Sequence, residues 1–147
     1  MYVWKLNYFV LQTDTLQFLL PVLVLQILMK GNATAQQFVL TEILAVLYAT
    51  QNSAVKCDVT RMIAQTIFSL IDYIVIWINK KRGCSNTTEL KRVEKTLDKV
   101  QKQVIAVSAF NCGAYNRALM YLEYKKEVTD AKDWELLQQI YVQVGSD

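Results

Sequence analysis

Histidine is absent from this chain, so the side chains that we consider first for chemistry are the cysteines and the carboxylates. The most suggestive is Cys112, which stands beside Gly113 in a short turn. A cysteine nucleophile needs a neighbouring base to form the reactive thiolate, and histidine commonly fills that role. Without a histidine, we interpret Cys112 as a small packing residue.

Metal and cofactor sites are not predicted either. The cysteines at positions 57, 84 and 112 lie much further apart than the ligand pairs of zinc sites. No glycine-rich phosphate loop and no kinase catalytic-loop sequence is present. Asp72 is an isolated carboxylate, which we interpret as a hydrogen-bonding group on or between helices. We therefore expect no active site, metal or cofactor within these 147 residues.

The stretch Val104–Glu123 instead predicts a structural unit, a helical hairpin. Small and large apolar residues recur three and four positions apart on both sides of a turn at 111–114, which is the spacing of one helix face. Glycine enters the left-handed conformation that ends a helix without steric cost. The residues that we expect to build the hairpin are Ala106, Phe110, Gly113, Tyr115, Ala118 and Leu119.

This order of small residue, large residue, glycine, tyrosine and alanine is typical of a tetratricopeptide-like (TPR-like) unit. Ala106 and Ala118 would let the two backbones approach closely, while Phe110 and Tyr115 fill the remaining space. One such unit cannot bury its own apolar face, so we expect a further helix to stack on it.

Composition predicts an all-α fold. Hydrophobic residues make up 53% of the chain, and one proline and four glycines leave little material for turns. The net charge of +3 does not by itself indicate nucleic-acid binding. An odd number of widely spaced cysteines suits an intracellular, reducing compartment, and the N-terminus does not have the pattern of a secretory signal.

Residues 1–82 are predicted to form HEAT-like helical repeats. Met1–Gln12 is apolar and aromatic, and the cluster at 13–15 is a candidate N-cap for a helix over Leu16–Met29. Pro21 either kinks that helix or belongs to its first turn. A further helix is expected over Gln36–Ala49, after a stop at 30–32.

The longest predicted helix is Val59–Arg82, which ends in three cations. We interpret it as a core helix and not as a membrane span, because Gln65 and Asp72 interrupt its apolar run. The segment Leu16–Met29 is too short to cross a membrane. The buried stripe expected for the longest helix consists of Met62, Ile63, Thr66, Ile67, Leu70, Ile71, Ile74 and Trp77.

A polar linker is predicted over 83–88, followed by a charged helix over Glu89–Gln103. The helix has a seam with coiled-coil spacing, formed by Leu90, Val93, Leu97, Val100 and Val104. Its charges are of mixed sign, which favours a solvated face over a nucleic-acid contact. A last helix is expected over Trp134–Val144, capped at 129–130 or at 132–133, with an apolar stripe of Leu136, Leu137, Ile140, Tyr141 and Val144.

Several segments resemble the ATR-type phosphatidylinositol 3-kinase-related kinases. The stretches FLLPVLVLQIL at 18–28, EILAVL at 42–47 and QTIFSLIDY at 65–73 are similar to the end of that family's HEAT-repeat region. The stretches IAVSAF at 105–110 and AYNRALMYLE at 114–123 resemble the opening of its FAT domain. The resemblance implies an α-solenoid of antiparallel helical hairpins, HEAT-like over 1–82 and TPR-like from 89 to 147, where a FAT domain begins.

The chain departs from this family at two points. Relatives tend to have a proline-containing break after the pair corresponding to Leu97 and Asp98, whereas this chain continues with KVQKQ at 99–103. We therefore expect the helices on either side to merge. The kinase domain that ends such proteins is also absent, so we expect the chain to be a fragment or a truncated product.

The resemblance implies a non-catalytic segment of a nuclear serine/threonine kinase of the DNA damage and replication checkpoint. ATP and magnesium would be needed only by the missing kinase domain. The expected partners are the remaining solenoid, that kinase domain and a subunit like the ATR-interacting protein, without direct contact to nucleic acid or a membrane. Two other hypotheses remain open. One is a free-standing helical adaptor that binds a partner helix along the 89–104 seam, and the other is a small helical membrane protein.

Overall fold

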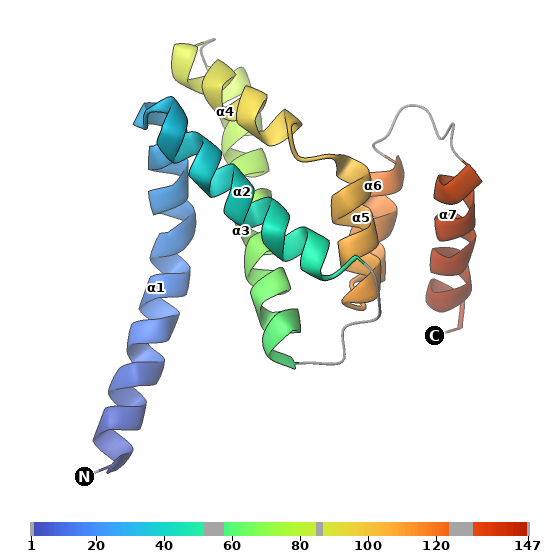
Figure 1. The fold of residues 1–147 in the computed structure, drawn as a ribbon, viewed down its shortest axis with the longest axis horizontal. Helices are drawn as coiled ribbons and strands as arrows, with labels where there is room; N and C mark the ends of the chain where they lie inside the picture. Colours follow the sequence, from blue (N-terminus) through green and yellow to red (C-terminus); the bar gives the residue numbers. More distant parts are fainter. Residues whose placement is uncertain (1, 52–57, 85–86, 124–130, 147) are drawn as a thin grey trace. The chain divides into compact units, whose positions relative to one another are not determined.

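All elements that the structure describes are helices, which confirms the all-α prediction. A computed structural model describes residues 2–51, 58–84, 87–123 and 131–146, with side chains from Thr15 onward except Leu16. The helices are shown in Figure 1 and run in the order α1 (Tyr2–Lys30), α2 (Ala33–Ala49), α3 (Asp58–Arg82), α4 (Thr88–Asp98), α5 (Lys102–Asn111), α6 (Tyr115–Glu123) and α7 (Ala131–Val144).

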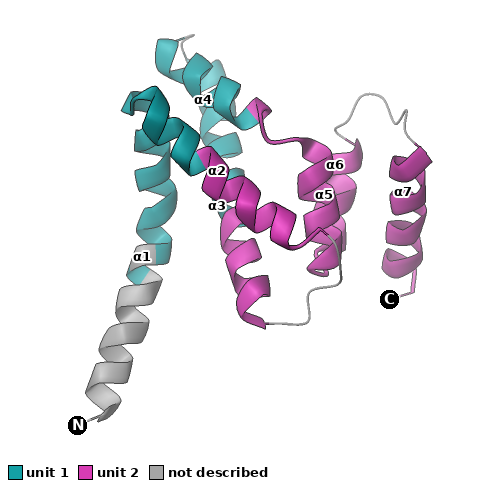
Figure 2. Ribbon diagram, viewed as in Figure 1, with its two compact units in different colours: residues 1–39, 68–97 teal, residues 40–67, 98–147 magenta. Residues whose placement is uncertain are grey.

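The helices group into two compact units, coloured separately in Figure 2. Unit 1 comprises residues 1–39 and 68–97, and unit 2 comprises residues 40–67 and 98–147. Each unit takes residues from both sides of the predicted linker at 83–88. The division into units therefore does not coincide with the linker, and it does not test the predicted change of repeat type there.

The core of unit 1 is built from α1, the second half of α3, and α4. Its buried apolar side chains are Val24, Leu25, Leu28, Met29, Phe68, Leu70, Ile71, Ile74, Ile78, Leu90 and Val93. They recur at helical spacing on each element, so one stripe of each helix faces the core.

The turn between α1 and α2 is closed by side chains. Asn32 caps α2, because its Oδ1 accepts a hydrogen bond from the Ala35 N–H at 2.8 Å. The Gln36 side-chain amide donates to the carbonyls of Leu28, at 3.0 Å, and Gly31, at 3.4 Å. The cap starts α2 at Ala33, three residues before the predicted start.

The prediction for the N-terminal region was wrong in one respect. The structure has one helix, α1, where the sequence suggested a segment over 1–12, a cap at 13–15 and a new helix. Pro21 therefore lies well inside α1 and not in a first turn. Thr and Asp are tolerated within helices at a small cost, so a cap-like cluster marks a helix start only when the preceding residues are not themselves helical.

The predicted stripe of α3 is also partly wrong. Met62 and Ile63, which were expected in the stripe, are 57% and 47% exposed, and Ile76 is 54% exposed. The buried positions are Ala64, Phe68, Leu70, Ile71, Ile74 and Ile78. A helix with apolar residues around most of its circumference offers several stripes, and only its neighbours decide which one is buried.

The expected merger of the helices around 99–103 does not occur. Helix α4 ends at Asp98 and α5 begins at Lys102. Gln101 is extended, with φ −65° and ψ 130°, and its carbonyl accepts the N–H groups of Val104 and Ile105 at 3.0 and 3.3 Å. Val100 is buried within this break. The chain thus breaks between α4 and α5 without a proline, and the side chain of Val100 in this break is buried.

Helix α7 begins before its predicted start, and the cap proposed at 132–133 is wrong because both residues lie inside the helix. The alternative cap at 129–130 lies outside the described residues. Ile140 is fully buried as predicted, whereas Tyr141 and Val144 are 53% and 38% exposed.

Within the described part of the chain, α3 is the helix that is long and apolar enough to cross a membrane, with a mean hydropathy of 1.5 and 33% of that window buried. Core helices of water-soluble proteins can reach the same length and hydropathy, so this property alone does not favour a membrane protein.

Candidate functional site

The hairpin predicted from the sequence is formed by α5 and α6 in unit 2. The Gly113 N–H donates to the Phe110 carbonyl at 3.0 Å, and the Ala114 N–H donates to the Ala109 carbonyl at 2.8 Å. These two bonds form a Schellman motif, which closes a helix end with a residue in the left-handed conformation. Gly113 has φ 79°, so a glycine here removes the strain that a Cβ atom would introduce.

The six predicted hairpin residues lie on α5, on α6 and in the turn between them. Ala106 and Ala118 are fully buried, and α5 packs against α6. The rings of Phe110 and Tyr115 meet edge to face with centroids 5.5 Å apart, a favourable geometry for aromatic pairs. Leu119 is half-buried. Small residues are therefore fully buried in the hairpin, and an aromatic pair lies beside the turn.

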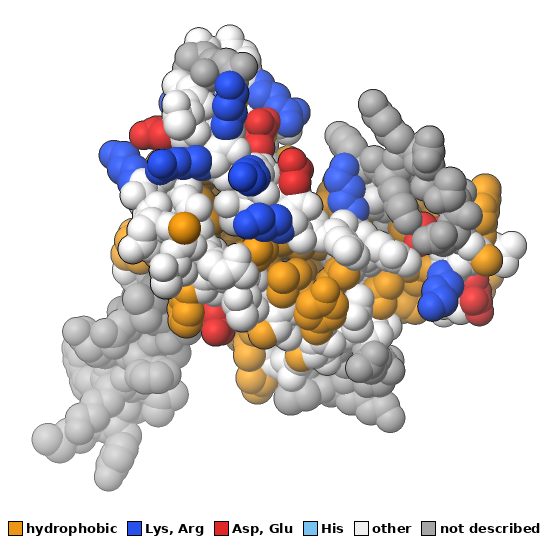
Figure 3. Space-filling view, turned by 45° about the horizontal axis from the view of Figure 1, so that its top comes forward, with side chains coloured by type: hydrophobic (Ala, Val, Ile, Leu, Met, Phe, Trp, Pro, Cys, Tyr) orange, Lys and Arg blue, Asp and Glu red, His pale blue; other side chains and the backbone are white. Residues whose placement is uncertain are grey.

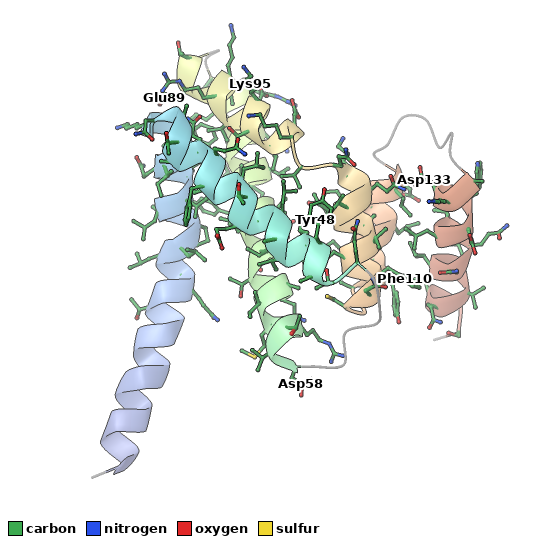
Figure 4. All side chains as sticks on the ribbon, in the orientation of Figure 1. Tyr48, Asp58, Glu89, Lys95, Phe110 and Asp133 are labelled. Atoms are coloured by element: carbon green, nitrogen blue, oxygen red, sulfur yellow. The ribbon has the colours of Figure 1, made fainter. Side chains whose placement is uncertain are left out.

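A third helix, α7, packs on α6 in the same unit. It contributes the buried Ile140 and the buried carboxyl residue Asp133. Figure 4 shows Phe110 and Asp133 on the α5–α6–α7 part of unit 2. A single hairpin of this kind needs such a partner, because its apolar face is not covered by its own two helices.

A polar cluster with a buried centre, which we call the polar joint, connects the end of α2 to α5 within unit 2. It consists of Thr50, Ser108 and Asn111. The hydroxyls of Thr50 and Ser108 are hydrogen-bonded to each other, and both residues are 0% exposed. The Thr50 hydroxyl donates to the Leu47 carbonyl at 2.8 Å, so the Ser108 hydroxyl must be the donor to Thr50.

Asn111 completes the joint by closing the C-terminal end of α2. Its side-chain amide donates to the carbonyls of Thr50 at 2.5 Å and Gln51 at 2.9 Å. The last carbonyls of a helix have no partner within the helix, and a buried carbonyl without a partner is costly. The amide of a residue on α5 supplies the missing donor.

The sequence analysis missed the polar joint. Its only local signal is a single hydroxyl residue, Ser108, on the otherwise apolar face of α5. A buried hydroxyl needs a hydrogen-bond partner, so the signal predicts that a partner exists but does not identify it. Thr50 is 58 residues away in the sequence.

The environment of Cys112 does not favour a reactive thiolate. The residue is buried and its thiol is free. Burial raises the pKa of the Cys112 thiol above its ordinary value of 9.0, and the nearby positive charge of Arg61 opposes this shift only in part. The thiol is therefore neutral at physiological pH, and the arrangement suits a packing residue.

No group of three or more His, Cys, Asp or Glu residues within the described ranges is placed to hold a metal ion. The feature that the geometry offers is a hairpin fixed by a Schellman turn and attached to the end of α2 through hydrogen bonds to Thr50 and Gln51.

Comparison with known proteins gives two matches. A family model described as "Serine/threonine-protein kinase ATR, M-HEAT region" matches residues 10–146. The serine/threonine-protein kinase ATR of Arabidopsis thaliana is 29% identical to this chain over an alignment of 148 positions. The alignment covers 75% of this chain and 6% of that protein. The chain thus spans a small part of the length of this relative. No solved structure matches it.

Replacing Gly113 with alanine is expected to lower the free energy of unfolding by about 1–2 kcal/mol, because alanine in the left-handed region is strained. Urea denaturation followed by circular dichroism measures this change. Gly83→Ala is the matched control, since Gly83 does not have a positive φ and an added Cβ there would meet only the Lys80 carbonyl oxygen at 3.9 Å. Equal stability of the two variants would contradict the role assigned to the turn.

Replacing Asn111 with alanine removes the donor to the carbonyls of the buried Thr50 and the half-buried Gln51 and is expected to cost about 1–3 kcal/mol. Asn111→Asp retains the size of the side chain but sets carboxylate oxygens against carbonyl oxygens, so its cost should be at least as large. The control is Asn116→Ala in the exposed first turn of α6, with a change within about 0.5 kcal/mol. A harmless Asn111→Asp would rule out a donor role.

Cys112 is expected to react with iodoacetamide at least about tenfold more slowly than the exposed Cys84 at pH 7.5, because the thiol is buried and its pKa is raised. Peptide mass spectrometry on a Cys57→Ser background gives both rates, and urea should equalise them. Equal rates in the folded chain would mean that the thiol is accessible.

The raised pKa of the Cys112 thiol also predicts that the free energy of unfolding falls as the pH rises above 9.0, because the thiol then loses its proton more readily in the unfolded chain.

Proposed function

Since the chain belongs to the M-HEAT family of the serine/threonine-protein kinase ATR, we propose that it is a structural segment of an ATR-like kinase that holds the kinase domain in position. The observation that carries this proposal is the family match over residues 10–146. The segment itself is a non-catalytic stretch of HEAT-type helices. Its role would be mechanical, since each repeat of a solenoid contacts only its neighbours and passes on their orientation.

The polar joint supports a mechanical role. A scaffold must resist sliding between successive helices, and apolar packing alone is not directional. Hydrogen bonds from Ser108 and Asn111 to the end of α2 require one register. Displacing α5 along α2 by a turn would leave these buried groups without partners, at a cost of about 1–3 kcal/mol each.

The activity of the whole protein is part of the proposal. An ATR-like parent would be a nuclear kinase that acts in the response to DNA damage and stalled replication, and would phosphorylate Ser/Thr-Gln sites with ATP and magnesium. Its expected partner is a subunit like the ATR-interacting protein. The family match does not separate residues 89–147 from those before them, so the start of a TPR-like FAT domain there remains a prediction.

The structure does not favour the alternative of a free-standing adaptor that binds a partner helix along the 89–104 seam. Four seam residues, Leu90, Val93, Val100 and Val104, are buried within the two units. Leu97 is half-buried. A partner helix therefore has no continuous apolar seam to bind along 89–104.

An immunoprecipitation tests the proposed function directly. An antibody against Glu89–Gln103 should recover a protein far larger than 16.9 kDa from lysates of the source cells. The precipitate should phosphorylate a Ser-Gln peptide in the presence of ATP and magnesium, and should leave the matched Ala-Gln peptide unmodified. A single band near 16.9 kDa without kinase activity would overturn the proposal.

A further inference from the structure

The positive charge of the chain is concentrated in unit 1. Unit 1 contains eight Lys and Arg residues against four Asp and Glu residues, while unit 2 contains eight against nine. The net charge of +3 thus understates the local excess. The cations of unit 1 within the described side chains lie at the end of α1, at the end of α3 and on α4.

These three places are neighbours within unit 1. The Arg82 Nε at the end of α3 lies 2.7 Å from the Glu94 Oε1 on α4. The Arg92 guanidinium on α4 donates to the carbonyl of Met29, in the last turn of α1, at 3.4 Å. Both arginines are thereby engaged in holding the three helix ends together, and Glu94 is engaged with Arg82.

Five exposed lysines remain on these elements. We call them the basic surface: Lys30, Lys80, Lys81, Lys91 and Lys95. No described carboxylate forms an ion pair with any of them. Figure 3 shows lysine and arginine side chains gathered on one part of the molecule, with acidic side chains interspersed among them, and Figure 4 places Lys95 and Glu89 on α4.

Helix dipoles account for only part of this arrangement. Cations at the C-terminal ends of α1 and α3 are favourable for the helices themselves. Lys91 and Lys95 have no such explanation, because they lie within α4, one turn apart on the same side. On α4 itself, Glu94 is paired with Arg82 of α3, and Glu89 is the exposed carboxylate of α4 that belongs to unit 1.

We propose that the basic surface binds the phosphate backbone of double-stranded nucleic acid without reading its bases. Lysine is a compact point charge that suits phosphate contacts, whereas bidentate recognition of carboxylates favours arginine. Here five of the seven described cations are lysines, and the two arginines, although exposed, are already engaged with Glu94 and with the Met29 carbonyl. This difference favours a phosphate backbone over an acidic peptide.

The absence of exposed aromatic residues on the basic surface points to a duplex and not to a single strand. Binding of single strands usually relies on aromatic side chains that stack on the bases. Among the described side chains of unit 1, the exposed aromatic residues are Phe18, Phe38 and Tyr73. None of them belongs to α4 or to the last turn of α1 or α3.

Fluorescence anisotropy with a labelled 20-base-pair DNA duplex, and with an RNA duplex of the same sequence, tests the proposal on the whole chain. Lys91→Gln/Lys95→Gln should weaken binding about tenfold at 100 mM salt and reduce the slope of log K against log salt by about 2. The control Lys102→Gln/Lys132→Gln removes two exposed cations of unit 2 and should change the affinity less than about threefold. Circular dichroism verifies that all variants retain their helix content.

Loss of affinity specific to the first variant with either duplex would support the proposal and identify the nucleic acid. Equal losses in both variants, no binding of either duplex, or tighter binding of labelled poly-glutamate of the same charge would overturn it. The result is independent of the proposed kinase function, because a chain that ignores nucleic acid still belongs to the same family.

Discussion

The carbonyl groups at the C-terminal ends of α1 and α2 are the constraint on which this arrangement of helices depends. The last carbonyls of a helix lack partners within the helix, and side chains of later helices supply donors to Met29 at the end of α1 and to Thr50 just after α2. Arg92 on α4 donates to Met29 at the end of α1, 63 residues away. Asn111 on α5 donates to Thr50 just after the end of α2, 61 residues away. In each unit, a side chain of a later helix thus donates a hydrogen bond to a carbonyl at the end of an earlier helix.

This closure explains why polar residues lie inside an otherwise apolar stack. Thr50 and Ser108 are fully buried, which is unfavourable unless each hydroxyl has a partner. Their mutual hydrogen bond, together with the Thr50 bond to Leu47, satisfies both. Apolar stripes hold the helices together, while these directional bonds select one register. A segment built in this way can transmit the orientation of one repeat to the next, as its proposed role requires.

The sequence was informative wherever the determinants are local. The hairpin could be predicted, because Gly113 and the small and large residues around it act within a few positions. The break after Asp98 and the buried face of α3 could not, since they depend on which neighbour covers Val100 and Phe68. The polar joint was missed for the same reason. Its hydrogen bonds join residues about 60 positions apart, and a helical period does not reveal them.

A double-mutant cycle between Thr50 and Ser108 would test most directly whether the polar joint couples successive helices. The free energies of unfolding of Thr50→Val, Ser108→Ala and the double variant would be measured by urea denaturation against the unmodified chain. Our account predicts a coupling energy of about 1 kcal/mol or more, because Thr50→Val leaves the buried Ser108 hydroxyl without its acceptor and Ser108→Ala removes the donor to Thr50. Effects that add to within about 0.5 kcal/mol would contradict it.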